Sequence, residues 1–246
     1  MVSNSELKFL RQLKMKKFRE LNRAFVVEGA KVVQEVLNSS WKIHSVYATD
    51  KYLLSHSLPV EAKVITKTQS EQLTSFSTDA ELYALVEMPD KKVFDAASKK
   101  ILLLDAIRDA GNMGTIIRTA DWFDIHAIVC SPDTVELYNP KTLQSTMGSF
   151  TRVDVFYNDL LQFMQEHKQY TYYGTFMQGN PIGECKFDEY AAIVLGSESH
   201  GISEKTAAGI QQKISIPLVG GTHRQTQPES LNVAVSAAIC CYELNK

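Results

Sequence analysis

The sequence has none of the features of a disulfide-stabilised, zinc-ribbon or membrane protein. Its 246 residues include only four cysteines, and no two of them form a C-x-x-C pair; they are Cys130, Cys185, Cys240 and Cys241. Structural zinc sites need closely spaced ligand pairs, so we expect no metal. Scattered cysteines in a chain of this size are typical of a reduced protein, and we therefore expect a cytoplasmic location.

Long apolar runs and targeting signals are also missing. No window reaches the roughly 18 apolar residues of a membrane span. The start "MVSNSELKFLRQLKMKKF" lacks the continuous apolar stretch of a signal peptide. Hydrophobic residues make up 44% of the chain, as in ordinary soluble proteins. The net charge of -2 excludes a strongly basic protein but permits a local basic patch. We expect a soluble protein without a membrane partner.

The glycine pattern G-x-G-x-x-G does not occur, which disfavours a dinucleotide-binding Rossmann domain. The glycine-rich methyl-donor loop of the common methyltransferase fold is missing as well. The chain contains instead two series of short apolar segments that alternate with helical patterns. Residues 1–92 follow the order βαβαβαβ after a basic front segment, and they predict a small α/β domain with one helix capped at Ser70.

A linker around 90–99 leads to the second predicted domain, residues 97–246. Its first strand, "KKILLLDAI", contains an unbroken apolar run that is typical of a strand buried on both faces of a parallel sheet. The segment "ELYNPKTLQSTMGSF" is expected to be a loop. The remaining pattern predicts an α/β domain with a mostly parallel sheet.

Residues 6–23 are rich in lysine and arginine, and their apolar residues fall at helical spacing. Two interpretations stay open. The basic face is either an ordinary solvated helix surface or an arm that contacts phosphates. The residues assigned to the second interpretation are Lys14, Lys16, Lys17, Arg19 and Arg23.

Three polar, glycine-rich loops follow buried strands of the second domain, at residues 105–118, 195–201 and 216–232. Ligands of parallel α/β sheets bind at the carboxyl ends of the strands, so these loops predict one shared pocket. Taken singly, Glu198 could be a surface acid, and Ser230 and Asn232 could cap a helix, with Ser230 as the cap. Arg118 in the apolar run "GTIIRTADWF" could pair with Asp105, Asp109 or Glu198, or its head could reach the pocket.

The segments "GNMGTIIRTAD", "IVLGSESHGIS" and "IPLVG…ESLNVAVSAA", in this order, resemble the three signature motifs of the SpoU (TrmH-type) RNA ribose 2′-O-methyltransferases. "NPKTLQSTMGS" between the first two adds to the resemblance. It implies a trefoil-knotted SPOUT domain, S-adenosylmethionine as methyl donor, transfer to a ribose 2′-hydroxyl of tRNA or rRNA, and a homodimer. The front of the chain is similar to the small RNA substrate-binding domain that many members carry.

The same resemblance assigns roles to individual residues. The catalytic set would be Arg118, Asn112, Glu198, Ser230 and Asn232. The set that contacts the methyl donor would be Gly196, Ile216, Leu231, Leu195, Leu218 and Asn232. Since the ordinary pKa of arginine lies above about 12, Arg118 would either surrender a proton only briefly or hold the substrate phosphate and the developing alkoxide.

Two features depart from the family pattern: Ser199 stands where glycine is usual, and "GGTHRQTQ" lengthens the loop before the third motif. They favour an alternative function, a non-methylating RNA-binding or ribosome-assembly protein on the same scaffold. A third interpretation is a small-molecule enzyme without a nucleic-acid partner. Neither the RNA nor the nucleotide can be predicted from the motifs, because ribose chemistry permits base-independent recognition.

Overall fold

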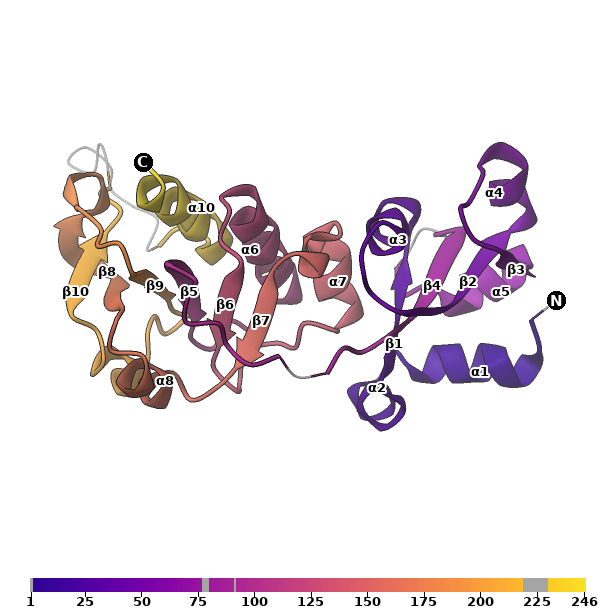
Figure 1. Ribbon diagram of the computed structural model, residues 1–246, viewed down its shortest axis with the longest axis horizontal. Helices are drawn as coiled ribbons and strands as arrows, with labels where there is room; N and C mark the ends of the chain where they lie inside the picture. The colour runs from indigo at the N-terminus through magenta and orange to yellow at the C-terminus, as the bar shows by residue number, and fades with distance from the viewer. Residues whose placement is uncertain (1, 77–79, 91, 219–229) are drawn as a thin grey trace, which may run out of the picture. The chain divides into compact units, whose positions relative to one another are not determined.

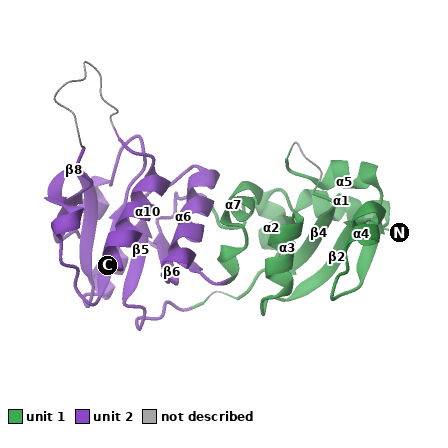
Figure 2. Cartoon of the chain, turned by 90° about the horizontal axis from the view of Figure 1, so that it is seen from above, with its two compact units in different colours: residues 1–92, 136–151 green, residues 93–135, 152–246 purple. Residues whose placement is uncertain are grey.

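The computed structural model describes residues 2–76, 80–90, 92–218 and 230–246. The chain forms two compact units (Figure 2). Unit 1 contains residues 1–92 and 136–151, and unit 2 contains residues 93–135 and 152–246.

Unit 1 carries a four-stranded mixed sheet in the order β1-β4-β2-β3 (Figure 1). Its elements are α1 (Asn4–Gln12), α2 (Lys16–Asn22), β1 (Ala24–Glu28), α3 (Ala30–Leu37), β2 (Ile43–Thr49), α4 (Asp50–Ser55), β3 (Ala62–Ile65), α5 (Lys67–Leu73), β4 (Leu82–Glu87), α7 (Pro140–Thr146) and the short 3-10 helix η1 (Ser149–Thr151). Strand β4 pairs antiparallel with β1 and β2, whereas β2 and β3 are parallel.

Each face of this sheet has its own core. On one face, Leu7 and Leu10 of α1 and Leu73 of α5 pack with Tyr47 and Tyr83. The other face holds an aromatic cluster in which the Phe25 ring lies 4.8 Å from the Tyr138 ring and 6.2 Å from the Phe150 ring, centre to centre. The cluster also includes Trp41. Burial of large aromatic side chains is a major source of folding stability.

Tyr138 and Phe150 lie in the segment 136–151, which joins unit 1 although the sequence predicted a loop within the second domain. Two observations account for the difference. The segment forms a helix, α7, with Asn139 as N-cap and Pro140 in its first turn. Its aromatic side chains complete the cluster around Phe25. The unbroken domain predicted for residues 97–246 is therefore interrupted by a piece that belongs with unit 1.

Unit 2 carries a six-stranded sheet in the order β10-β8-β9-β5-β6-β7, in which every pairing is parallel. Its elements are β5 (Lys100–Leu104), α6 (Ala110–Trp122), β6 (Ala127–Cys130), β7 (Asp154–Tyr157), α8 (Leu160–Glu166), β8 (Thr171–Pro181), the 3-10 helix η2 (Ile182–Glu184), β9 (Ala191–Leu195), α9 (Glu204–Ala207), β10 (Gln212–Ser215) and α10 (Val233–Leu244). The predicted α/β class with a mostly parallel sheet is confirmed.

The sheet of unit 2 is covered on both faces, as its apolar strands predicted. Helices α6 and α10 pack against each other on one face, and α8 lies on the opposite face (Figure 1). The α8 side chains Leu160, Phe163 and Met164 bury Ile101 and Leu103 of β5. Phe94, from the predicted linker, lies 4.9 Å from the Phe163 ring and packs against this core. The chain before β5 is thus anchored in unit 2.

Helix α5 begins one turn earlier than the cap predicted at Ser70. Thr66 is the N-cap, and its hydroxyl accepts a hydrogen bond from the Gln69 amide at 3.2 Å, while the Gln69 side chain accepts one from the Thr66 amide at 2.9 Å. Ser70 is buried inside the helix, where its hydroxyl contacts the Tyr83 hydroxyl. The two hydrogen bonds between Thr66 and Gln69 form a capping box.

Thr66→Ala should therefore lower the free energy of unfolding by about 1 kcal/mol, because the cap bond to Gln69 is lost. Urea titration followed by circular dichroism measures the change. Thr68→Ala is the matched control, since Thr68 is exposed and makes no cap bond; it should leave stability unchanged or slightly raised. Equal losses in both variants would show that the capping box is energetically silent.

All four cysteines are free, and Cys130, Cys240 and Cys241 are buried. Burial raises the pKa of the Cys240 and Cys241 thiols to about 12, so both are protonated and unreactive at neutral pH. Within the described part of the chain, no helix is long and apolar enough to cross a membrane.

Candidate active site

Two of the three predicted loops meet because their strands are neighbours. Strands β5 and β9 pair in parallel with Leu104 opposite Leu195, so the loops that follow leave from the same edge of the sheet. The Asp105 amide donates a hydrogen bond of 2.8 Å to the Leu195 carbonyl and extends this pairing beyond the strands. The start of α10 supplies the third motif.

The Glu198 carboxylate joins the three motifs. Its Oε1 accepts hydrogen bonds from Asn112 Nδ2 at 3.0 Å, from Asn232 Nδ2 at 2.6 Å and from the Val233 amide at 3.3 Å. Asn232 Nδ2 also donates to Asn112 Oδ1 at 3.0 Å. We call Asn112, Glu198 and Asn232 the amide–carboxylate cluster. Hydrogen bonds to an ionised acceptor are stronger than neutral ones, so the cluster holds two helix starts and one turn in fixed positions.

The cluster sits at helix N-termini that are capped by their own side chains. Asn232 is the N-cap of α10, where its Oδ1 accepts from the Ala234 amide at 2.9 Å. The sequence predicted Ser230 as this cap and Asn232 in the first turn. That prediction was wrong, because the cap lies two residues further along the chain. Asp109 caps α6 and accepts from the Asn112 amide at 2.8 Å. Both caps orient the asparagine side chains toward Glu198.

A tight turn presents Glu198. Ser197 and Gly201 exchange two backbone hydrogen bonds of 3.0 Å and 2.8 Å, and Gly201 has a φ of +66°. Gly196 stands where a Cβ would fall 2.1 Å from the Gly201 carbonyl carbon and 2.2 Å from the Ile202 nitrogen. These are backbone atoms, so no side chain fits at position 196 without opening the turn. Ser199, the departure from the family pattern, is exposed, and its hydroxyl lies 2.7 Å from His200 Nδ1.

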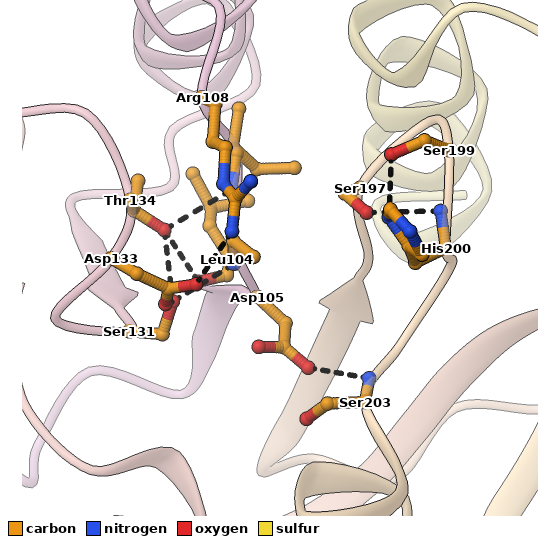
Figure 3. A network of polar contacts seen from close by, with 12 residues as sticks. Leu104, Asp105, Arg108, Ser131, Asp133, Thr134, Ser197, Ser199, His200 and Ser203 are labelled. Carbon is orange, nitrogen blue, oxygen red and sulfur yellow. Dashed lines mark hydrogen bonds and ion pairs between the residues drawn. The ribbon is translucent and has the colours of Figure 1, made fainter.

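A cavity of about 270 Å³ lies between the loop after β5 and the turn after β9. One wall carries Asp105, Arg108 and Asn112, and the other carries Glu198, His200 and Ser203. Figure 3 shows Asp105 reaching to Ser203, while Arg108 lies on the side of Asp133. Asp105 is 5% exposed, and its Oδ2 accepts a hydrogen bond from the Ser203 amide at 2.8 Å. The sequence pattern indicated Asp105 only as a possible partner of Arg118, and it gave no signal for Arg108 or His200.

Arg118 is not part of this cluster. It lies almost two turns beyond Asn112 on α6, given 3.6 residues per turn, and does not line the cavity. Its side chain is exposed and makes no hydrogen bond or ion pair with any residue that the structure describes. The alternative of a buried ion pair with Asp105, Asp109 or Glu198 is therefore wrong. Arg118 is left as an unpaired cation on the solvent-facing side of α6.

The residues predicted to contact the methyl donor differ in exposure. Leu195 is buried, so only its backbone is available, and Ile216 is half-buried. Leu218 and Leu231 are 57% and 47% exposed, and Ser230 is exposed as well. The long "GGTHRQTQ" loop lies entirely outside the described residues. Ile216 and Leu218 follow strand β10, and Leu231 precedes helix α10; the third motif connects this strand and this helix.

The basic residues predicted to contact RNA fall into two groups. Arg19 is 2% exposed, pairs with Glu136 and donates to the carbonyls of Leu13 and Lys14, so it stabilises unit 1 and has no free head for a phosphate. Lys14 donates to the Thr74 carbonyl at 2.6 Å, and burial lowers the pKa of its ammonium.

The other three basic residues, like Lys14, lie at the surface. Arg23 is held by the Pro89 carbonyl and Asp90. Lys16 is exposed and makes one loose surface pair, 3.7 Å from Glu20. Lys17 is exposed and makes no hydrogen bond or ion pair with a residue that the structure describes. Such surface pairs contribute little to stability, so both ammonium groups are available.

Within the described residues, no group of three or more histidine, cysteine or acidic side chains could hold a metal ion. The site is instead built from amides, carboxylates and backbone groups. Such an arrangement can orient a neutral hydroxyl through hydrogen bonds.

Two family models match the chain in the order of its two units. The model of the SpoU rRNA Methylase family matches residues 99–242, and the model of the MRM3-like substrate binding domain matches residues 4–85. The first match alone spans more than half of the chain. It includes every residue of the amide–carboxylate cluster.

Similar proteins and structures agree with these matches. The 23S rRNA (guanosine(2553)-2'-O)-methyltransferase RlmP of Bacillus subtilis (strain 168) is 32% identical over 98% of this chain and 96% of its own length. The structure of a putative RNA methyltransferase of the TrmH family from Porphyromonas gingivalis is 32% identical, covers 99% of this chain and 98% of its own, and superposes with a TM-score of 0.86.

A third similar structure supports only the shared fold, because its sequence identity to this chain is low. The SpoU methyltransferase AviRb from Streptomyces viridochromogenes, in complex with the cofactor AdoMet, is 20% identical with a TM-score of 0.82 and covers 98% of this chain and 97% of its own. The two closer likenesses extend over almost the entire chain, and the family model contains all three motifs. The chain therefore belongs to the SpoU rRNA methylase family, as its motifs predicted, and it is an RNA ribose 2′-O-methyltransferase.

Proposed function

We propose that the protein transfers the methyl group of S-adenosylmethionine to a ribose 2′-hydroxyl of ribosomal RNA. The observation that carries the proposal is the amide–carboxylate cluster, which ties the three motifs together beside a cavity. Ribosomal RNA is favoured over tRNA because RlmP, a relative that is 32% identical along 98% of this chain, is named for 23S rRNA. This substrate implies a cytoplasmic location.

The residues at the third motif fit an adenosine-containing donor. Leu218 and Leu231 expose apolar side chains, Ile216 is half-buried, and Gly196 has no side chain that could obstruct an approach to the backbone. Apolar walls with backbone donors and acceptors suit an adenine ring and its edge. Leu195, Gly196, Ile216, Leu218, Leu231 and Asn232 would hold the donor. When bound, it supplies an activated methyl group.

The chain's own part of the reaction is placement and proton handling. Asn112 would orient the ribose hydroxyl through its remaining amide hydrogen and lone pair. Asn232, whose amide hydrogens and oxygen are all engaged, would hold Asn112 and Glu198 in place. Ser230, just before α10, would contact the substrate from the third motif. Arg118 would hold the substrate phosphate and stabilise the developing alkoxide, or accept the hydroxyl proton briefly. That Arg118 has no partner among the residues that the structure describes supports a role toward a ligand.

We further propose a homodimer, a trefoil knot in unit 2 and an RNA-binding role for unit 1. The dimer is supported by Trp122, Val235 and Tyr242, which leave large apolar surfaces exposed on the adjacent helices α6 and α10. The knot is supported by the family membership and by α10, which packs against α6 and β9. The RNA-binding role is supported by the substrate-binding model that matches residues 4–85.

The test is transfer of labelled methyl groups from S-adenosylmethionine to ribosomal RNA isolated from cells that lack this gene. We expect labelling of rRNA and little labelling of tRNA. Calorimetric titration with S-adenosylmethionine addresses the rival function, a ribosome-assembly protein on the same scaffold. A chain that binds RNA but shows neither donor binding nor transfer would support that rival.

Lys16→Glu combined with Lys17→Glu should weaken RNA binding, because two exposed cations would be replaced by anions. If each lysine contacts one phosphate, the slope of log affinity against log salt should fall in magnitude by about 1.4 to 1.8. Filter binding to rRNA fragments at several salt concentrations measures it. The control is Lys168→Glu with Lys186→Glu in unit 2, which changes the net charge equally. Equal slopes in the two variants would remove these lysines from the RNA-binding surface.

A further inference from the structure

The cavity beside the cluster contains a buried carboxylate whose hydrogen-bonding capacity is only partly used. Asp105 is 5% exposed and lines the cavity. Its Oδ2 accepts from the Ser203 amide at 2.8 Å, and Figure 3 draws no contact to the other oxygen. Among the residues that the structure describes, none donates a hydrogen bond to Oδ1. This oxygen is not sealed from solvent, so it is open to the cavity and can accept hydrogen bonds from a ligand that brings donors.

No neighbouring cation satisfies Asp105. Arg108 lines the same cavity, but its guanidinium pairs with Asp133 at 3.8 Å, and its side chain is largely exposed. Asp133 in turn accepts a hydrogen bond from the Ser131 hydroxyl at 2.7 Å, which fixes it on the neighbouring loop. Arg108 is thus held beside Asp133 and makes no ion pair with Asp105.

The cavity connects Asp105 with the amide–carboxylate cluster. Asn112 and Glu198 line it together with Asp105. Its volume of about 270 Å³ lies just below the roughly 300 Å³ at which ligand pockets start, so it suits one nucleoside rather than a longer stretch of RNA. A ribose at the cluster and a base at Asp105 would thus occupy the same cavity.

We propose that Asp105 recognises the base of the target nucleotide and selects guanine; this inference rests on the proposed function. Guanine is the one RNA base that presents two adjacent donors, the ring N1–H and the exocyclic N2 amine, on its Watson–Crick edge. One carboxylate oxygen with two lone pairs accepts from both. Adenine and cytosine place an acceptor beside their donor, and uracil flanks its N3–H with two carbonyls, so each would face repulsion from Oδ1. RNA bases are commonly recognised on this edge when unstacked.

The decisive variant is Asp105→Asn. The asparagine carboxamide can still accept from the Ser203 amide through its oxygen, which directs its NH2 group into the cavity and replaces the free acceptor by a donor. Guanine then loses its partner, whereas xanthine, which carries a carbonyl in place of the N2 amine, gains one. A residue that only caps the Ser203 amide would not produce this exchange.

The experiment measures binding of GMP, AMP, CMP, UMP, IMP and XMP to the full-length protein by ligand-observed NMR. For the wild type we expect GMP to bind about tenfold more tightly than AMP, CMP or UMP, and more tightly than IMP, which lacks the N2 amine. In Asp105→Asn, GMP affinity should fall about tenfold and XMP should become the preferred nucleotide. Asp124→Asn, at a side chain that is 91% exposed, is the matched control and should retain the preference for GMP.

Equal affinities for the nucleotides, no binding of any of them to the wild type, or an unchanged GMP preference in Asp105→Asn would each overturn the assignment. Methyl transfer to rRNA by the wild type is measured in parallel. Transfer without a GMP preference would sink the inference and leave the proposed function standing. A GMP preference with the xanthine switch, but no transfer, would sink the proposed function and leave the guanine site.

Discussion

Arg118→Ala is expected to reduce methyl transfer about 100- to 1,000-fold while the fold stays intact. The loss follows if the guanidinium stabilises charge that develops on the ribose oxygen or holds the adjacent phosphate. Stability should change by less than about 0.5 kcal/mol, because the side chain is exposed and bonds to no other described residue. Single-turnover transfer assays and thermal unfolding measure the two effects.

Arg118→Lys separates the two roles proposed for this residue. If Arg118 holds a phosphate as a cation, lysine should restore part of the rate, although it lacks the planar fork of donors. If Arg118 gives up a proton, lysine should shift the pH dependence of the rate to lower pH, because the ordinary pKa of lysine is about 10.4. Full activity of Arg118→Ala would remove the residue from the mechanism altogether.

Gly196→Ala is expected to cost about 3 kcal/mol of stability and about 100-fold in methyl transfer. The added Cβ would lie 2.1 Å from the Gly201 carbonyl carbon and 2.3 Å from its oxygen, so the turn must open. Opening the turn displaces Glu198, and both asparagines of the cluster lose their common acceptor. Chemical denaturation and transfer assays test the two losses.

Two glycine variants serve as controls for that result. Gly183→Ala adds a methyl group where no atom lies within 4 Å and should leave stability and activity unchanged. Gly201→Ala also meets no atom within 4 Å, but its φ of +66° strains any side chain and should cost about 1 kcal/mol. If Gly196→Ala behaved like Gly183→Ala, the close approach between positions 196 and 201 would not exist in solution.

The local sequence pattern predicted the location of the site at the sheet edge more accurately than the roles of individual residues there. The apolar run of β5 and the polar loops after β5 and β9 were enough to predict a shared pocket, because parallel strands bring their carboxyl ends to one edge. The structure brings Asn112, Glu198 and Asn232 together there. The cap was misassigned to Ser230 because serine and asparagine are nearly equivalent at this position, and only the backbone angles distinguish them.

Other features depended on contacts far apart in the chain. The segment 136–151 looked like a loop, although Asn139 followed by Pro140 is a helix-start signal that could have been recognised. Its packing against Phe25 could not, since no local pattern records which unit an aromatic side chain completes. Arg19 looked like its basic neighbours, but its partner Glu136 is distant in sequence. Asp105 became notable only once its cavity and its single donor were known.

The most direct test of the central claim identifies the methylated atom. Ribosomal RNA from cells lacking the gene is incubated with the purified protein and S-adenosylmethionine, digested to nucleosides and analysed by mass spectrometry against authentic standards. A cluster that positions a ribose hydroxyl at a guanine-selective cavity predicts newly formed 2′-O-methylguanosine. Methylation on a base atom, or no new methylated nucleoside despite bound donor, would contradict the account.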